Sequence, residues 1–399
     1  MTHPSSFPVI RMRPKKSPQR LRWGAPWVYN DELVLDRRAR NLTPGSIVEL
    51  QANDGEQLGL AAFNADSKIT CRMLDRDLSA TIDQAWLATR LQYALDMRTR
   101  LYDAPFYRLI HAEADGLPGV VIDRFGDVAV IQPNAAWAEV KIKELAAALA
   151  DVTGVTTIIK NGTGRARSLE GLPEETVTLL GDISDAVAVE MNGATYFADL
   201  VQGQKTGLFL DQRDNHAFVA RLAKGGAVLD VFSHVGGFAL AALANGATSA
   251  VAVDGSAAAL ELAERGAAAS GFSDRFSTIK GDAFDTMAAM QAENKRFGLV
   301  VCDPPAFAPN KNALEAGLRA YERIARLGAG LTEKGGYLVV CSCSHAVDMD
   351  KFRDASTRGI GKAGRRAQLI HSGAAGPDHP MHTSLAETGY LKSLFFRLE

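Results

Sequence analysis

Two cysteines stand one residue apart in the stretch VVCSCSHAV, residues 339–347. If this stretch is a β-strand, Cys341 and Cys343 point to one face and Ser342 to the other, unless the strand has already ended. The spacing suits neither a disulfide nor a zinc-ligand pair of the C-x₂-C type. Two interpretations remain: a pair of small buried residues, or a thiol placed at a strand end for nucleophilic chemistry.

A second set of residues, in and after the stretch LDVFSHVGGF (229–238), has the pattern of a ligand-binding turn. An apolar strand is followed by a glycine pair that opens an apolar helix, so the backbone can approach a ligand closely. The next two strands also end in acids, and an acid after the second strand normally binds a ribose diol. The residues that we assign to this cofactor pocket are Asp230, Phe232, Ser233, Gly236, Gly237, Asp254 and Asp282.

The pocket residues select among nucleotide ligands. The turn lacks the G-x-G-x-x-G pattern of dinucleotide folds and has no P-loop lysine, so pyrophosphates and triphosphates fit poorly. Acids at three strand ends favour a nucleoside that carries a cationic group, and S-adenosylmethionine is such a ligand. The plain alternative is an ordinary βαβ unit with acids at its surface. No metal site is expected.

The sequence VVCDPPAFAPNK places Asp303-Pro304-Pro305 at the end of the next strand. Prolines at that point stop strand pairing and set a rigid turn. The turn can present Asp303 and backbone carbonyls to the polar edge of a nucleobase, with Phe307 available to stack on the ring. Several amino-group methyltransferases share this D-P-P-[FY] motif, so it indicates nucleobase chemistry without fixing the atom that is modified.

A thiol near such a turn has a specific use. In a doubly wound sheet, ligands bind outside the carboxyl ends of the strands, where Cys343 falls. A thiolate can add to carbon 6 of cytosine, which makes carbon 5 nucleophilic enough to take a methyl group. Asp303 would hydrogen-bond or protonate N3. We therefore assign Cys343 and Asp303 as catalytic residues, with Cys341 as a buried neighbour.

The remaining pattern supplies the elements that position these residues. Short strand-like runs separated by turns fill the first part of the chain, a helix is expected from Asp83 to about Arg100, and strands then mix with a second helix. From about residue 200, continuous apolar runs alternate with helices, as in a parallel sheet covered on both faces. We predict an α/β protein with a β-barrel over 1–78, a small α+β middle domain over 79–195 and a doubly wound Rossmann-like domain over 196–399.

The bulk composition narrows the class of protein. The net charge is −2, there is no apolar run of membrane-spanning length and no signal pattern, and four cysteines make no disulfide framework. A reducing cytoplasm is the expected location, without membrane association. Residues 10–22, IRMRPKKSPQRLR, are basic with no acid among them. They form either a solvated face or an edge that contacts phosphates, with Arg20 as a candidate.

Together these residues resemble the ribosomal RNA large subunit methyltransferase I family, which makes 5-methylcytosine in 23S rRNA. The similarity runs over nearly the full length. The matching segments are GAPWVYN (24–30), EADGLPGVVID (113–123), GQKTGLFLDQRDN (203–215), FSHVGGF (232–238), DPPAF (303–307), SCS (342–344), DHP (378–380) and YLK (390–392). The K-T-G-x-x-L-D-Q-R block is the most specific of them.

The resemblance carries further expectations. It implies an RNA-binding PUA domain at the N-terminus, a lid and strand from Lys205 to Arg213 beside the cofactor, and Cys343 as nucleophile. Gln212 and Arg213 are then cofactor contacts, while the substrate contacts are Pro304, Pro305, Phe307, Lys205 and Arg20. Related enzymes often carry a second cysteine, to release product, where this chain has Ala306. His345 is one candidate for the missing base. His234 in the glycine loop is another departure.

The preferred hypothesis is an S-adenosylmethionine-dependent rRNA cytosine C5-methyltransferase. One alternative is an exocyclic-amine methyltransferase that uses Asp303-Pro304-Pro305 on guanine or adenine without a covalent step. Another is a non-catalytic RNA-binding factor for ribosome assembly. The target nucleotide, the choice between naked rRNA and an assembling subunit, and the oligomeric state, with a homodimer as one option, stay open.

Overall fold

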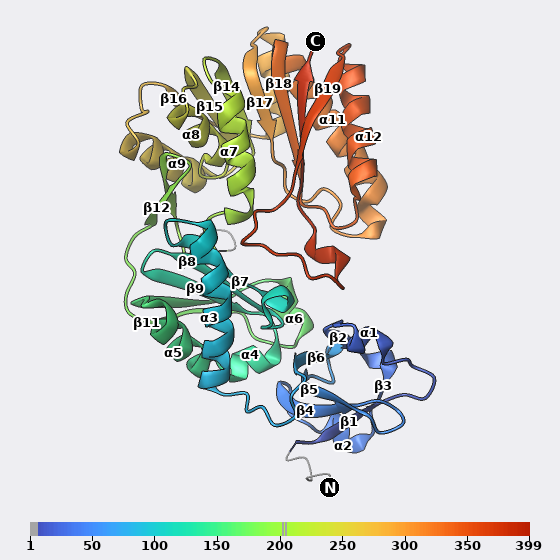
Figure 1. The fold of residues 1–399 in the computed structure, drawn as a ribbon. Helices are drawn as coiled ribbons and strands as arrows, with labels where there is room; N and C mark the ends of the chain where they lie inside the picture. Colours follow the sequence, from blue (N-terminus) through green and yellow to red (C-terminus); the bar gives the residue numbers. More distant parts are fainter. Residues whose placement is uncertain (1–6, 202, 204–205) are drawn as a thin grey trace. The chain divides into compact units, whose positions relative to one another are not determined.

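The computed structural model describes residues 7–201, 203 and 206–399 (Figure 1). The chain divides into two compact units. The N-terminal unit contains Met1–Asp185, Leu200–Gly207 and Asp378–Thr388, and the C-terminal unit contains Ala186–Asp199, Leu208–Pro377 and Gly389–Glu399. In the part of the chain that is described, no helix is both long and apolar enough to cross a membrane.

The first part of the N-terminal unit is a six-stranded sheet with the order β2-β6-β5-β4-β1-β3. Along β1, exposed and buried residues alternate, so one face of the strand packs on a core that includes Val28, Val48 and Phe63. This confirms the predicted strands. The elements are β1 (Val9–Met12), α1 (Gln19–Arg22), β2 (Trp27–Tyr29), β3 (Leu33–Val34), α2 (Arg37–Arg40), β4 (Ser46–Gln51), β5 (Gln57–Phe63) and β6 (Ile69–Asp75).

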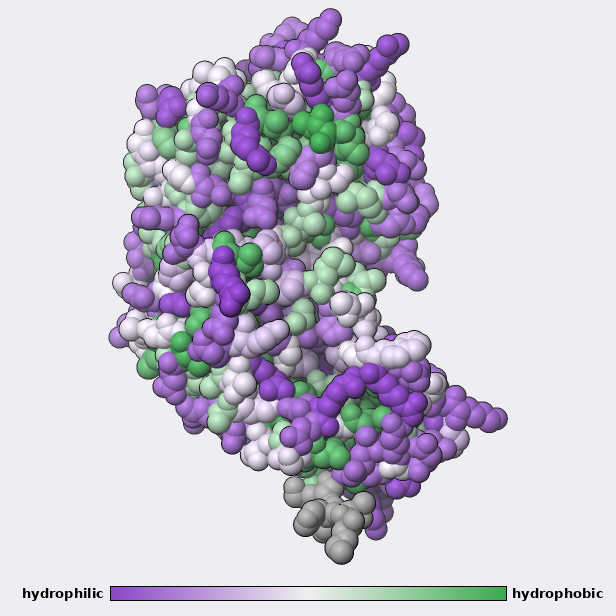
Figure 2. Space-filling model, in the orientation of Figure 1, coloured by the Kyte–Doolittle hydropathy of each residue, from purple (hydrophilic) through white to green (hydrophobic). Residues whose placement is uncertain are grey.

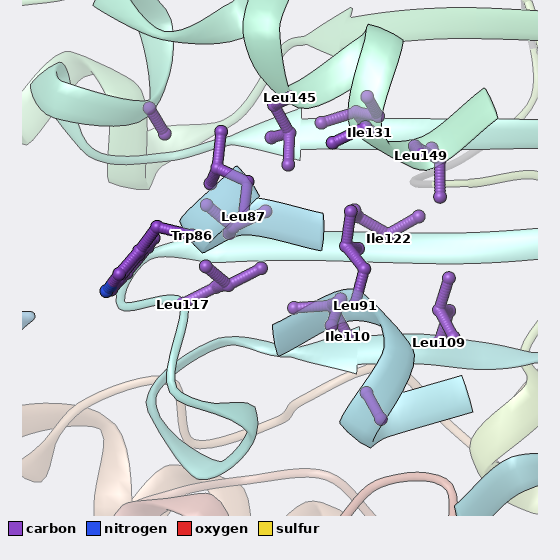
Figure 3. Packing of buried hydrophobic residues seen from close by; sticks show 14 of the residues in the cluster. Trp86, Leu87, Leu91, Leu109, Ile110, Leu117, Ile122, Ile131, Leu145 and Leu149 are labelled. Carbon is purple, nitrogen blue, oxygen red and sulfur yellow. The ribbon is translucent and has the colours of Figure 1, made fainter. Parts of the chain in front are cut away.

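The middle of the chain forms a five-stranded sheet with the order β11-β10-β9-β8-β7. The predicted long helix is α3 (Gln84–Leu101), which begins where the Asp83 side chain accepts a hydrogen bond from the Trp86 amide. Figure 3 shows its residues Leu87 and Leu91 packing with Leu145 and strand residues of this core. The other elements are β7 (Phe106–His111), β8 (Val120–Phe125), β9 (Val128–Pro133), α4 (Ala136–Val140), α5 (Ile142–Thr153), β10 (Thr157–Gly162), α6 (Arg165–Leu169) and β11 (Glu175–Leu180).

The segment Asp378–Thr388 lies far along the chain but belongs to the N-terminal unit. Buried Asp378 accepts a hydrogen bond from the Arg108 amide at 3.0 Å, and its carbonyl accepts one from Arg98 at 2.8 Å. Asp378 also contacts the His379 ring at 2.9 Å. The DHP motif therefore begins in a buried polar network of the N-terminal unit.

The C-terminal unit is built on a seven-stranded sheet with the order β16-β15-β14-β17-β18-β20-β19. The pairs from β16 to β18 are parallel, and β20 is antiparallel to both its neighbours. This confirms the doubly wound α/β fold. Its strands are β14 (Ala227–Val231), β15 (Ser249–Asp254), β16 (Phe276–Lys280), β17 (Phe297–Cys302), β18 (Thr332–Ser342), β19 (Ala367–Gly373) and β20 (Lys392–Leu398).

Helices connect the parallel strands, as the alternating pattern predicts. They are α8 (Gly237–Ala244), α9 (Ala257–Ala269), α10 (Ala283–Ala292), α11 (Leu314–Leu331) and α12 (Met349–Lys362), preceded by the hairpin β12 (Val187–Met191) and β13 (Ala194–Ala198) and by α7 (Arg213–Leu222). The strand order reverses at β14, which pairs with β15 on one side and with β17 on the other. Such a switch point opens a crevice outside the carboxyl ends of the strands.

Truncation of the core side chain of Leu91, which is fully buried, tests the packing of the middle domain. We expect Leu91→Ala to lower the free energy of unfolding by about 2 to 5 kcal/mol, because it leaves a cavity under α3. Tyr93→Ala on the same helix is the control, since Tyr93 is 79% exposed, and should change stability by less than about 0.5 kcal/mol. Chemical denaturation of the intact chain measures both; equal losses would contradict this packing.

Candidate active site

The glycine turn after β14 has a backbone that few residues can adopt. Phe232, His234 and Gly236 have φ angles of 63°, 49° and 79°, all in the left-handed region. At Gly237 a Cβ atom would lie 2.7 Å from the His216 ring, so a larger residue cannot fit without a shift. The turn is therefore held tightly against α7, with the start of α8 facing the crevice.

Two buried polar atoms in this turn have no hydrogen-bond partner among the described residues. Asp230 is fully buried; its Oδ2 accepts a hydrogen bond from the Ala239 amide at 3.0 Å, and its Oδ1 accepts none. Ser233 is 4% exposed, and its Oγ also has no hydrogen-bond partner among the described residues. A buried polar atom without a partner costs about 1 to 3 kcal/mol, so these atoms indicate a ligand with polar groups.

The other two acids of the predicted pocket serve the backbone in different ways. Asp254 accepts hydrogen bonds from the amides of His234 at 2.9 Å and Ser256 at 2.8 Å, so it fixes the glycine turn from the neighbouring strand. Asp282 is exposed and caps α10, accepting from the amide of Phe284 at 2.9 Å. Its contact with a cofactor remains a prediction.

The described part of the segment expected as a strand beside the cofactor contains no strand, and its last residues are helical. Residues Leu210–Gln212 form a 3₁₀ helix and α7 begins at Arg213, so the predicted strand from Lys205 to Arg213 is wrong. Its buried side chains are held by helical turns rather than by a sheet partner. Arg213 is 9% exposed and lies near His216 and Tyr196. Lys205 lies outside the described residues.

Gln212 contacts the catalytic edge of the site. Its Nε2 donates a hydrogen bond to Oδ2 of Asp303 at 2.9 Å, and its Oε1 accepts one from Asn215 at 2.6 Å. The Asp303 amide in turn donates to the Val231 carbonyl at 3.1 Å. Asp303 is therefore oriented from the 3₁₀ helix that precedes α7, and its amide is hydrogen-bonded to the last residue of β14.

The rest of the DPPAF motif packs in an aromatic cluster. Pro304 is buried, Pro305 is exposed and Phe307 is half-buried. The ring centroid of Phe307 lies 6.3 Å from that of Phe232, 6.0 Å from Phe284 and 5.0 Å from Tyr321. Sequence reasoning did not find Phe284 or Tyr321, although Phe284 follows the acid at the end of β16.

The four cysteines, all of them described, differ in exposure. Cys71, Cys302 and Cys341 are buried, and Cys343 is half-buried. Burial raises the pKa of Cys302 and Cys341 far above the usual thiol range, so both stay protonated. Strand β18 ends at Ser342, so Cys343 lies just beyond it, at the carboxyl edge of the sheet.

Hydroxyl groups on both sides of Cys343 tie its loop to the DPPAF turn. The Oγ of Ser344 accepts a hydrogen bond from the Ala308 amide at 3.0 Å and lies 2.8 Å from the Tyr321 hydroxyl. Ser342 donates to the same hydroxyl at 2.9 Å. This buried network positions Cys343 relative to the turn that begins at Asp303. In the sequence, the serines on either side of the cysteine are its only visible sign.

His345, a candidate base, is exposed, and its ring centroid lies 5.8 Å from that of Tyr390. The Tyr390 hydroxyl donates to Oδ2 of Asp211 at 2.6 Å. His345 therefore contacts Tyr390, which in turn is hydrogen-bonded to Asp211, on the side of the Cys343 loop.

Half of the six basic residues in the run 10–22 pair with acids from other parts of the N-terminal unit. Lys16 pairs with Asp31 at 2.7 Å, and Arg22 pairs with Glu56. Arg20, 53% exposed, pairs with Glu32 at 3.3 Å. Figure 2 shows hydrophilic side chains gathered over α1.

Comparison with known proteins assigns the chain to a family. Residues 147–397 match the family of S-adenosylmethionine-dependent methyltransferases, and residues 10–76 match a PUA-like domain. A ribosomal RNA large subunit methyltransferase from Deinococcus radiodurans is 35% identical over 99% of both chains. A ribosomal RNA large subunit methyltransferase I from Alteromonas mediterranea is 35% identical over 94% of this chain and 95% of the relative.

This chain belongs to the ribosomal RNA large subunit methyltransferase I family.

Solved structures show the same fold as this methyltransferase. A candidate S-adenosylmethionine-dependent methyltransferase from Streptococcus mutans superposes with a TM-score of 0.81 at 19% identity, covering 98% of this chain and all of the other (100%). A candidate methyltransferase complexed with SAH gives a TM-score of 0.81 at 20% identity, covering 98% of this chain and 99% of the other.

The pocket of this methyltransferase fits S-adenosylmethionine, its cofactor. Oδ1 of Asp230 and Oγ of Ser233, which have no hydrogen-bond partner among the described residues, would be available to polar groups of the cofactor. Burial raises the pKa of Asp230 to about 7, and the Asp254 carboxylate adds to this. A cationic ligand beside Asp230 would favour its ionised form and so relieve part of the cost of burial.

The pH dependence of cofactor binding tests the role of Asp230. S-adenosylmethionine should bind the wild type more tightly as pH rises through about 7, because the carboxylate then ionises, whereas Asp230→Asn should bind weakly and without this dependence. Isothermal titration calorimetry between about pH 6 and about pH 8 measures the affinities. Asp274→Asn, at an 81% exposed side chain, is the control. A parallel pH profile in Asp230→Asn would contradict the assignment.

The same shift predicts a stability difference without cofactor. The folded chain keeps a proton on Asp230 that the unfolded chain releases above its ordinary pKa of 3.8. Wild-type stability should therefore fall relative to Asp230→Asn as pH rises from about 4 to about 7. Thermal denaturation of both proteins over this range measures the difference.

Proposed function

We propose that this methyltransferase transfers the methyl group of S-adenosylmethionine to carbon 5 of a cytosine in large-subunit rRNA, with Cys343 as the covalent nucleophile. The position of Cys343 carries the proposal. It is the half-buried thiol among four cysteines, it follows the last residue of β18, and its loop is hydrogen-bonded to the turn that holds Asp303.

The chemistry needs a nucleophile because carbon 5 of cytosine is unreactive. In the first step the Cys343 sulfur anion forms a bond to carbon 6, and N3 receives a proton or a hydrogen bond from Asp303, so the electron pair of the 5,6 double bond becomes available at carbon 5. Gln212 holds the Asp303 carboxyl group through Oδ2. We assign this orienting role to Gln212 in place of the expected cofactor contact.

S-adenosylmethionine supplies a methyl group on a sulfonium, which is open to in-line displacement. Carbon 5 bonds to this methyl group as the carbon–sulfur bond of the donor breaks. A base then removes the carbon 5 proton, and the Cys343 sulfur leaves carbon 6 with its bonding electrons, which restores the double bond and the thiolate. Removal of that proton releases the methylated base from the enzyme. His345 is a candidate for the base that removes it, because it is exposed and lies two residues after Cys343.

The substrate assignment rests on the relatives and on the domain composition. Relatives along nearly the whole chain are named ribosomal RNA large subunit methyltransferases, and PUA domains generally bind structured RNA. Because acids of the N-terminal domain pair with half of its basic run, we expect RNA contact to depend on local cations such as Arg20 and Lys205 rather than on a uniform basic face. Pro304, Pro305 and Phe307 would frame the target base. We place the reaction in the cytoplasm.

Covalent trapping tests the adduct. Large-subunit rRNA in which 5-fluorocytosine replaces cytosine should stay bonded to the protein, because fluorine on carbon 5 cannot leave as a cation and the Cys343 sulfur is not released. A protein–RNA band that resists denaturation, dependent on S-adenosylmethionine, is the expected result. Cys343→Ala should give no such band, and Cys341→Ala should give one.

Methylation itself separates the proposal from its rival. Cys343→Ala should lower methyl transfer roughly a thousandfold or more, since the covalent step is lost. The product of the wild type, digested and analysed by mass spectrometry, should contain 5-methylcytosine. Normal turnover by Cys343→Ala, or methyl groups on the amino groups of guanine or adenine, would favour the exocyclic-amine methyltransferase.

A further inference from the structure

Lys392 is a buried lysine beside the loop of Cys343. It is the first residue of β20, is 7% exposed, and pairs with Ser342 in the antiparallel register between β18 and β20. Ser342 is the residue before Cys343. The register of two strands that are distant in sequence therefore brings an ammonium group next to the proposed nucleophile.

The ammonium group has neutral partners only. Its Nζ donates hydrogen bonds to the carbonyl oxygens of Ser344 at 3.1 Å and Tyr390 at 2.7 Å. No carboxylate of a described residue lies within ion-pair distance of it. Burying a charge without an opposite charge costs several kcal/mol, so a lysine at this position needs a further reason.

The surroundings of Lys392 indicate that reason. Burial lowers its pKa, and a negative charge on Cys343 opposes this more strongly than Asp348 does. Asp348 lies near the surface at the start of α12 and is engaged by Lys351. A thiolate at position 343, in the loop whose Ser344 carbonyl accepts the Lys392 hydrogen bond, would therefore compensate the buried ammonium.

We propose that Lys392 is a positioning residue that holds the Cys343 loop through the Ser344 carbonyl and stabilises the Cys343 thiolate by its positive charge. The proposal rests on the proposed function, in which this thiolate attacks the cytosine. The thiol loses its proton to solvent before the attack, so the step needs no oxidant or reductant.

The other groups that face Cys343 do not supply this charge. Tyr321, from α11, is neutral, because burial raises its pKa. Asp348, the N-cap of α12, carries a carboxyl group whose pKa is lowered by Lys351, so it supplies no positive charge. His345, two residues after Cys343, is exposed. Lys392 from β20 is the cation that these described elements bring to the thiol.

The experiment measures ionisation of Cys343 directly, in the full chain without RNA or cofactor. The rate of alkylation by iodoacetamide is followed against pH by mass spectrometry of the peptide that contains Cys343. In Lys392→Met the midpoint should rise by about one pH unit and the rate at neutral pH should fall about tenfold. Lys392→Arg, which keeps the charge, should restore most of the rate.

Lys351→Met is the matched control. It removes the same charge from a lysine in the same unit, but Lys351 is 49% exposed and engages Asp348. Because Lys351 also compensates Asp348, which acts on Lys392, a second control is Lys334→Met, at an exposed lysine near the start of β18, and its alkylation profile should match that of the wild type. Alkylation profiles of wild type and Lys392→Met that superimpose would overturn the proposal, as would a slow rate in Lys392→Met that does not recover at high pH.

A reciprocal measurement does not depend on how the lysine variants fold. Cys343→Ala removes the thiolate, so the titration midpoint of Lys392, followed by NMR of the labelled side chain, should fall relative to the wild type. An unchanged midpoint would contradict the proposal. The failure of the proposed function is distinct: there, alkylation would depend on Lys392 as expected, but fluorinated RNA would form no adduct.

Discussion

The parallel pairing of β14 with β17 decides where the whole site lies. Val231 and Cys302 are register partners, and the hydrogen bond from the Asp303 amide to the Val231 carbonyl extends the pairing by one residue. Because the helices after these two strands leave in opposite directions, the chain opens there rather than being covered. The glycine turn and the Asp303 turn are therefore neighbours, which brings a methyl donor and a nucleobase edge within reach of each other.

Around this point the protein tolerates buried polar atoms that would be costly elsewhere. Oδ1 of Asp230 and Oγ of Ser233 lack partners, and the Lys392 ammonium lacks an opposite charge. A folded core rarely leaves such groups unless a ligand or an intermediate satisfies them. Their grouping at the carboxyl edge of one sheet is what a site for a polar, charged ligand requires.

The two units contribute in different ways. In the C-terminal unit, side chains are positioned by networks that cross several elements, such as Gln212 on Asp303 and Tyr321 between two serines. In the N-terminal unit, acids compensate the basic run, as Glu32 does for Arg20. An exposed salt bridge is weak, so a phosphate can compete for the arginine at small cost. RNA recognition would then replace individual carboxylate partners of the basic side chains by phosphates, rather than depend on a strong positive electrostatic field of the whole domain.

The sequence by itself determined the doubly wound fold, the glycine turn and the presence of Cys343 at a strand end, because continuous apolar runs, a glycine pair and a strand terminus are local properties of the chain. It did not determine that Asp282 caps a helix, that residues 210–212 are helical, or that Gln212 contacts Asp303, which is 91 positions away. Lys392 reached the Ser344 carbonyl across 48 positions. Such contacts depend on strand register and helix packing, and only the tertiary structure fixes those.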